Sequence, residues 1–329
     1  MTGHRLAILF VMIFSALQTG AQNPSGRIEA KYLFSYGPPG SPIELSQPQQ
    51  IRYDQNSSEI YVCDTGHNRI VILDSLGLYL FEFSNADVMR SPTDAAVDSE
   101  GRIYVLGSTH PESPVNIFDY NGEFLRPLSF QSGPEASSLA ITSMVMDRTN
   151  RLHLLDESGA RILSYNCLGE FVSEIALMPD ATAEERGKQV WGKLGLAGDD
   201  LLLPAPIDGT VYCYGSDGTL IRSFGNRGDG YGELSHPIAA AADGQRNIYV
   251  LDKHKGLIIS FSETSDVNQE LCGYGLKAGY LYHPIALMAD NAGRLWVAQG
   301  YNDRIQVFLT AALPVIDSSP SDQPIVVDN

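Results

Sequence analysis

The sequence is poor in cysteine. It has four cysteines in 329 residues, and they are Cys63, Cys167, Cys213 and Cys272. Their spacing excludes a CxxC pair, while disulfide pairing stays open because four cysteines allow three connectivities and the sequence selects none. Cys63 lies in the apolar stretch IYVCD, so we expect it to fill the core rather than to act as a redox group.

Basic residues are also scarce. The chain has 22 lysines and arginines against 39 aspartates and glutamates, which gives a formal net charge of −17. A surface this acidic repels phosphate groups over a long range. The charge therefore argues against a nucleic-acid partner and against binding to an anionic membrane surface.

Only one apolar run is long, and it lies at the start of the chain. Leu6–Leu17 (LAILFVMIFSAL) follows Arg5 and precedes the small residues Thr19-Gly20-Ala21. The run is too short to span a bilayer comfortably. We therefore expect residues 1–21 to be a cleavable signal peptide and the protein to be secreted or periplasmic, without stable membrane insertion. An N-terminal membrane anchor is the alternative.

The chain is instead rich in one recurring phrase, a short apolar stretch that ends in Asp, a turn with Gly or Asn, and a β-rich run. The markers of this phrase are Asp54, Asp98, Asp147, Asp243 and Asp290. The intervals between them are 44, 49, 96 and 47 residues, so a sixth unit without its Asp is expected near residue 195. The repeat period is thus close to 48 residues.

Each unit reads as four short strands joined by tight turns such as Asn121-Gly122. Successive hairpins of alternating apolar residues, with hardly any helical periodicity, indicate an all-β protein. Four strands in a period of this length are typical of a β-propeller blade. The fold class predicted is a six-bladed β-propeller of four-stranded antiparallel blades.

The last unit stops after three strands, and the first residues behind the leader supply the fourth. Residues 29–36 (EAKYLFSY) are strand-like and precede a Gly-rich connector that otherwise occurs only between units. A closed ring removes exposed sheet edges. We therefore expect residues 29–36 to close the last blade, within a propeller spanning residues 22–310. Residues 311–329 are rich in Pro, Ser and Asp and are expected to be flexible.

One segment departs from the β pattern. In PDATAEERGKQ, residues 179–189, Thr182 and Glu185 have the spacing of a capping box. We expect about two helical turns here, in the connector between units three and four.

The units resemble the NHL repeat. The stretches DTGHNRIVILDSLG (64–77) and YNDRIQVF (301–308), each after a strand, carry the resemblance, as do the units that begin at 92 and 283. The resemblance implies a six-bladed propeller and no single activity, since the family includes protein- and RNA-binding modules, sensor domains and a zinc-dependent peptide-amidating lyase. Arg69 and Arg304, the arginines of these two stretches, are candidates for ligand binding.

Five histidines are expected in loops at one end of the propeller, called the top face, which holds the inter-blade connectors and the loops between second and third strands. They are His67, His110, His236, His254 and His283. They either form a metal or proton-transfer cluster or are separate surface residues. In the lyase of the resembling family the ligands follow the proline, whereas His236 and His283 precede one, so a zinc site is not carried over.

The central channel gives a second set of candidates. Alignment on the marker aspartates places one early residue of each first strand at the channel, and these are Gln50, Asp94, Ser143, Lys193, Ala239 and Ala286. Asp94 and Lys193 are the only charges among them. The four polar residues could bind a small polar ligand, or they are solvated residues of a water-filled funnel.

Aromatic residues are frequent in the top-face segments. Trp191, Tyr231, Tyr280 and Tyr301 are candidates for a contact surface for a protein or glycan, the alternative being packing of the connectors onto the blades. We expect an exported, monomeric, non-enzymatic binding module for a protein, peptide or glycan, with no cofactor. The alternative is a lyase or hydrolase of propeller type that depends on zinc or calcium. No local catalytic motif such as GxSxG or HExxH occurs, although a propeller can assemble a site from distant loops.

Overall fold

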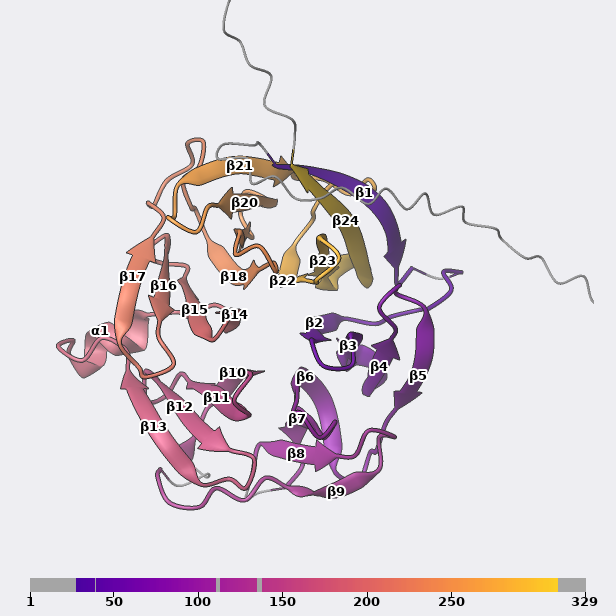
Figure 1. Ribbon diagram of the computed structural model, residues 1–329, viewed down its shortest axis with the longest axis vertical. Helices are drawn as coiled ribbons and strands as arrows, with labels where there is room; N and C mark the ends of the chain where they lie inside the picture. Colours follow the sequence, from indigo (N-terminus) through magenta and orange to yellow (C-terminus); the bar gives the residue numbers. More distant parts are fainter. Residues whose placement is uncertain (1–27, 39, 111–112, 135–137, 313–329) are drawn as a thin grey trace, which may run out of the picture.

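The computed structural model describes residues 28–312 except 39, 111–112 and 135–137. It consists of six four-stranded antiparallel sheets arranged as the blades of a propeller around a central axis (Figure 1). The six-bladed all-β fold predicted from the repeat is thus confirmed. The expected signal peptide, residues 1–21, lies outside the described residues.

Each blade runs from an inner strand at the axis to an outer strand at the rim. Blade 1 consists of β2 (Pro48–Asp54), β3 (Glu59–Asp64), β4 (Arg69–Leu73) and β5 (Tyr79–Phe83). Blade 2 consists of β6 (Met89–Val97), β7 (Ile103–Ser108), β8 (Val115–Phe118) and β9 (Phe124–Pro127). Blade 3 consists of β10 (Ile141–Met146), β11 (Arg151–Asp156), β12 (Arg161–Asn166) and β13 (Phe171–Ala176).

Blades 4 and 5 follow the same order, and blade 6 takes its outer strand from the start of the chain. Blade 4 consists of β14 (Gly195–Ala197), β15 (Asp200–Ala205), β16 (Thr210–Tyr214) and β17 (Leu220–Phe224). Blade 5 consists of β18 (Pro237–Ala242), β19 (Ile248–Asp252), β20 (Leu257–Phe261) and β21 (Val267–Cys272). Blade 6 consists of β22 (Pro284–Ala289), β23 (Arg294–Gln299), β24 (Arg304–Ala312) and β1 (Ile28–Tyr36).

Strand β1 closes the ring as the sequence predicts. It pairs antiparallel with β24, from Ile28 opposite Ala312 to Tyr36 opposite Ile305, and the two strands lie side by side in Figure 1. The Tyr36 ring stacks on Trp296 of blade 6, and its hydroxyl donates to the Gly77 carbonyl of blade 1. Residues 311 and 312, assigned to the tail from the sequence, belong to β24, and 313–329 lie outside the described residues.

The core consists of six apolar clusters, one between each pair of neighbouring blades. Because both faces of every blade are covered, the second and third strands are buried on both sides and read as continuous apolar runs such as IYVC and RIVIL. All four cysteines have free thiols, and Cys63 is fully buried in the cluster between blades 1 and 2. No helix in the described part of the chain is long and apolar enough to cross a membrane.

The marker aspartates organise the turns that follow the inner strands. Asp147 accepts hydrogen bonds on Oδ1 from the backbone N–H groups of Thr149 and Arg151 at 2.8 and 2.9 Å, and Asp290 accepts equivalent bonds in blade 6. The second oxygen of Asp290 accepts from Nε of Arg294, on the next strand. These carboxylates are buried, so part of the acidic excess has a structural function in the repeat.

The helix expected between units three and four is present as α1 (Ala183–Lys188), which projects from the rim in Figure 1. Its capping box is confirmed, because the Thr182 side chain accepts from the Glu185 backbone N–H and the Glu185 carboxylate accepts from the Thr182 backbone N–H. The helix lengthens the connector that leads into blade 4, whose inner strand is only three residues long.

The closing strand gives a stability prediction. Phe34 packs edge-to-face on Trp296 at 5.9 Å between ring centres, whereas the adjacent Leu33 points to solvent and is 37% exposed. We expect Phe34→Ala to lower the free energy of unfolding by about 2–3 kcal/mol because the ring closure loses this packing. Leu33→Ala, one residue away on the same strand, should change it by less than about 0.5 kcal/mol. Equal losses in urea unfolding would contradict the closure described here.

Candidate functional site

The axis of the propeller is lined by the inner strands, and the sequence alignment placed their residues correctly. In the paired strands Gln50 lies opposite Cys63, Ser143 opposite Leu155 and Ala239 opposite Leu251, which are equivalent positions of three blades. The inner strand shifts register just before each of these residues. We call the set Gln50, Asp94, Ser143, Lys193, Ala239 and Ala286 the upper ring.

Three of the predicted upper-ring residues contact one another. Asp94 Oδ2 accepts a hydrogen bond from Ser143 Oγ at 2.9 Å and one from Gln50 Nε2 at 3.4 Å, and the backbone N–H of Met144 donates to the same oxygen at 2.9 Å. Asp94 has no solvent exposure. It is therefore not a solvated residue of a funnel, as one alternative from the sequence had it, but a buried carboxylate with protein partners.

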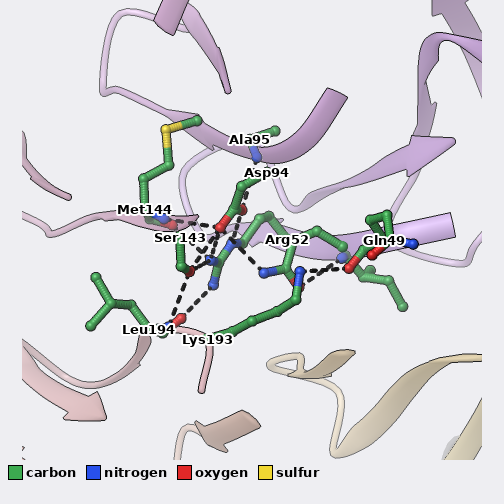
Figure 2. Close-up of polar contacts among 10 residues, drawn as sticks. Gln49, Arg52, Asp94, Ala95, Ser143, Met144, Lys193 and Leu194 are labelled. Atoms are coloured by element: carbon green, nitrogen blue, oxygen red, sulfur yellow. Dashed lines mark hydrogen bonds and ion pairs between the residues drawn. The ribbon is translucent and has the colours of Figure 1, made fainter. Parts of the chain in front are cut away.

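The residue that sequence reasoning missed is Arg52, two positions after Gln50. Its Nε and Nη2 bind both oxygens of Asp94 at 2.8 and 2.7 Å (Figure 2). Its Nη2 also donates to the Met144 carbonyl at 2.7 Å, and its Nη1 donates to the Leu194 carbonyl at 2.9 Å. One side chain from blade 1 thus binds blades 2, 3 and 4 and crosses the axis to the opposite side of the ring.

The residues at the level of Arg52 in the other five blades are uncharged. The equivalent positions of the other blades form what we call the middle ring, and they hold Ala96, Val145, Gly195, Ala241 and Met288. Gly195 lies in the blade opposite Arg52. A Cβ atom there would come within 1.9 Å of the Ala240 carbonyl oxygen, so the close approach of blades 4 and 5 requires glycine.

Lys193 crosses the axis in the other direction. Its Nζ donates to the Gln49 carbonyl of blade 1 at 2.8 Å. Burial lowers the pKa of Lys193, and the nearby Arg52 charge lowers it further, whereas Asp94 opposes the shift. Burial also disfavours the charged form of Asp94, but Arg52, Lys193 and the Met144 backbone N–H together outweigh burial and hold the pKa of Asp94 below its usual range.

The upper ring and Arg52 therefore connect four blades across the axis. We call this set of contacts, centred on the Arg52–Asp94 ion pair, the clasp. The polar atoms of Gln50, Asp94, Ser143 and Lys193 bind protein groups from neighbouring or opposite blades. Binding of a ligand by these four residues stays a prediction. A signal for Arg52 was present in the sequence, because it is the only charged residue at its level of the inner strands.

The candidate metal ligands lie in several different blades of the ring. His67 Nδ1 is 2.8 Å from Asp64 Oδ2, His110 stacks on Phe124, and His283 contacts Tyr301. In residues 28–312, apart from the gaps noted above, no group of three or more His, Cys, Asp and Glu side chains could hold a metal ion.

His236 and His254 are the two histidines of this set that stack on one another. Their rings are nearly parallel, with centres 4.2 Å apart. The backbone N–H groups of both residues donate to the Asp252 carboxylate. Burial and the neighbouring His254 ring lower the pKa of His236.

The aromatic candidates on the top face separate into buried and exposed residues. Trp191 is buried and packs on Tyr212 between blades 3 and 4, so for this residue the connector-packing alternative holds. Tyr231 is exposed in the connector before blade 5. Tyr280 and Tyr301 are exposed near the entrance to blade 6.

Four rings at the top of blade 6 are in contact, and we call them the aromatic patch: Tyr274, Tyr282, His283 and Tyr301. Tyr282 lies at the centre, with ring centres 5.3 Å from Tyr274, 4.5 Å from His283 and 5.2 Å from Tyr301. The Tyr274 hydroxyl raises the pKa of Tyr282. Tyr274 and Tyr301 are 56% and 72% exposed, so the patch presents aromatic surface to solvent.

The two candidate arginines fix the loops instead of facing solvent. Arg304 is buried and donates from Nη1 to the Leu276 carbonyl at 2.8 Å and from Nη2 to the Tyr280 carbonyl at 3.0 Å. Arg69 binds Asp64, Glu82 and the Glu44 carbonyl in the equivalent place of blade 1. Arg304 therefore holds the connector on which part of the aromatic patch is carried.

The residue before each of these arginines accepts a hydrogen bond from the backbone of the next blade. Asn68 and Asp303 both have positive φ, at 58° and 50°. Asn68 Oδ1 accepts from the Ser91 backbone N–H, and Asp303 Oδ1 accepts from the Gln47 backbone N–H, each at 2.7 Å. Asn and Asp tolerate this conformation better than other side chains. These bonds explain why an Asn or Asp directly precedes the arginine in both stretches.

Comparisons with known proteins agree on the fold. No model of a known protein family matches the sequence, and no curated protein matches it. Among solved structures, virginiamycin B lyase from Staphylococcus aureus is similar at 11% identity, with a TM-score of 0.54 over 86% of this chain and 99% of that one. A Bacteroides thetaiotaomicron protein of unknown function has 14% identity and a TM-score of 0.58 over 87% of this chain and 76% of its own.

A third similar structure is a nidogen/laminin complex, at 15% identity and a TM-score of 0.56 over 78% of this chain and 87% of that one. The chain is thus similar to six-bladed β-propellers that include binding modules and enzymes. At these identities the likeness establishes the architecture and leaves the activity open. The NHL assignment still rests on the sequence pattern.

The clasp predicts a pH-dependent contribution to stability. The pKa of Asp94 is lower in the folded chain than in the unfolded chain, where it is about 4. The stabilisation is therefore complete above that unfolded value and is lost as the pH falls toward the folded pKa. We expect Asp94→Asn to lower the free energy of unfolding by about 3–5 kcal/mol near pH 7, because Arg52 loses its charged partner. Below pH 4 this loss should be smaller than at pH 7, by about 1 kcal/mol or more.

Urea unfolding of the wild type and Asp94→Asn between pH 3 and 7 measures this difference. Glu100→Gln, at a carboxylate that is 69% exposed, is the control and should have a small effect at every pH. A loss for Asp94→Asn that does not change with pH would contradict the assigned role of the charge.

Proposed function

We propose that the protein is an exported, non-enzymatic binding module that holds a protein, peptide or glycan on the aromatic patch. The observation that carries the proposal is the contact of four aromatic rings whose outer members are largely exposed. Exposed tyrosines supply large contact areas with few rotatable bonds, and this makes them frequent at recognition surfaces. Isolated surface aromatics would not form such a cluster.

The patch is also fixed in place before any ligand arrives. Arg304 binds two carbonyls of the connector, and the Gln299 side chain accepts from the Tyr282 backbone N–H at 2.8 Å. Tyr301 itself lies in a short 3-10 helix, Gly300–Asn302, which ends at Asp303. A preformed surface loses less conformational entropy on binding. The similarity to a propeller from a nidogen/laminin complex supports a protein ligand.

Substitution in the patch tests this proposal. We expect Tyr274→Ala and Tyr301→Ala together to weaken ligand binding by at least about 30-fold, since truncation of an aromatic hot-spot residue costs about 2 kcal/mol or more. The unfolding midpoint should hardly change, because both rings are exposed. Tyr120→Ala is the matched control, because Tyr120 is similarly exposed but lies in the turn between β8 and β9 of blade 2, away from the top face.

The measurement is affinity capture from the exported fraction with wild type, double variant and control, together with a glycan array. A ligand retained by the wild type and by Tyr120→Ala but not by the double variant supports the proposal. A ligand retained equally by all three places the binding surface elsewhere and overturns it.

The metal-dependent lyase or hydrolase keeps a direct test of its own. Metal analysis of the purified full chain should find less than about 0.1 equivalents of zinc if the binding proposal is correct, because a zinc site in a folded protein binds tightly enough to keep its metal through purification. Stoichiometric zinc that is lost in His67→Ala and His283→Ala chains would overturn the binding proposal in favour of the enzyme.

A further inference from the structure

Below Arg52 the axis opens into a cavity of about 430 Å³ that reaches the bottom face, opposite the aromatic patch. We propose that this cavity binds a compact amphipathic molecule with a carboxylate at its inner end and an apolar body. This inference is independent of the proposed function, because it concerns the other face of the propeller. It rests on three features, the wall, the floor and the mouth of the cavity.

The wall is an apolar ring with one residue from each blade. The residue before the marker aspartate, or its equivalent, lines the cavity in all six blades, and we call these residues the lower ring: Tyr53, Val97, Met146, Leu196, Ala242 and Ala289. Every one of them is partly exposed, whereas the apolar residues one or two positions before them on the inner strands are buried. Blades 5 and 6 contribute alanines to this ring, the smallest of its side chains.

The inner end of the cavity, farthest from its opening, is formed by the guanidinium of Arg52, and we call this end the floor. Its side chain is 16% exposed, while its partner Asp94 has no exposure, so the accessible part of the ion pair is the cation. The Nη1 group carries two N–H donors, and one is bound to the Leu194 carbonyl. The second has no hydrogen-bond partner among the described residues, and Arg52 is one of the residues that line the cavity.

The charge of the floor favours an anion over a cation. Arg52 lines the inner end of the cavity, whereas its partner Asp94 is fully buried and is not part of the lining. The carboxylates of Asp54 and Asp147 also line the cavity, but both accept backbone N–H bonds from their own turns, and Asp147 also binds His153.

The mouth of the cavity is polar. Arg148 of blade 3 donates from Nε and Nη2 to the Gln55 side chain of blade 1 at 3.1 and 3.0 Å, and Asn56, Asn150 and Asn291 also line this end. Because Arg52 closes the inner end, a ligand can enter only from the bottom face. An apolar wall between a cationic floor and a polar mouth matches a chain that is charged at its inner end, and the volume is within the usual range of about 300–1,000 Å³ for small-molecule sites.

Octanoate is the probe for the first experiment. We expect the full chain to bind octanoate by isothermal titration calorimetry, and to bind octan-1-ol and octylammonium at least about tenfold more weakly, a difference of about 1.4 kcal/mol. Equal binding of octan-1-ol would show that the cationic floor contributes nothing and would overturn the proposal. No octanoate binding at millimolar concentration would mean that the cavity holds water only, with the same consequence.

Filling the cavity tests its location. Ala242→Phe places a ring in the lower ring and should weaken octanoate binding at least about tenfold. Ala176→Phe, the same change at an exposed position of the outer strand β13, is the matched control and should bind as the wild type does. If Ala242→Phe does not fold, Ala289→Phe makes the equivalent change in blade 6. Unchanged binding in a folded lower-ring variant would overturn the proposal, while Tyr274→Ala should have no effect on octanoate.

Discussion

The Arg52–Asp94 ion pair at the axis is the interaction on which the arrangement of the blades depends. A propeller has no packed centre, because its inner strands face one another across a channel rather than across a core. Here Asp94 is fully buried and Arg52 is largely buried, and every hydrogen bond of the Arg52 side chain joins its own blade to another one. The desolvation of both charges is offset by bidentate geometry and by backbone carbonyls as additional acceptors.

The same pair divides the molecule into two faces with different chemistry. Above it lie the connectors and the loops between second and third strands, which carry the aromatic patch. Below it lies a cavity with an apolar wall, and the two regions are not continuous because Arg52 and Lys193 cross the axis between them. A ligand on one face therefore has no direct path to the other, and any communication between them would pass through the clasp and the inner strands.

The repeated polar residues explain how a strongly acidic chain remains compact. Marker aspartates accept turn N–H groups at the bottom face, and acids or amides at the end of the second strand accept connector N–H groups at the top, as Asp64 and Asp252 do. In these positions a carboxylate replaces water for backbone donors that a tight turn leaves unpaired. The negative charge is thus distributed over both faces by the repeat itself.

The sequence alone determined the number of blades, the closing strand, the capping box of α1 and the alignment of the upper ring. All of these follow from local periodicity or from short-range hydrogen bonds, which the order of residues encodes directly. Only the tertiary structure decided what the aligned residues do. The Arg52 side chain crosses the axis to Leu194 of blade 4, and Trp191 is buried because two blades meet over it. Such outcomes depend on side-chain volumes from blades that are distant in sequence, and a pattern read along the chain does not contain their separation in space.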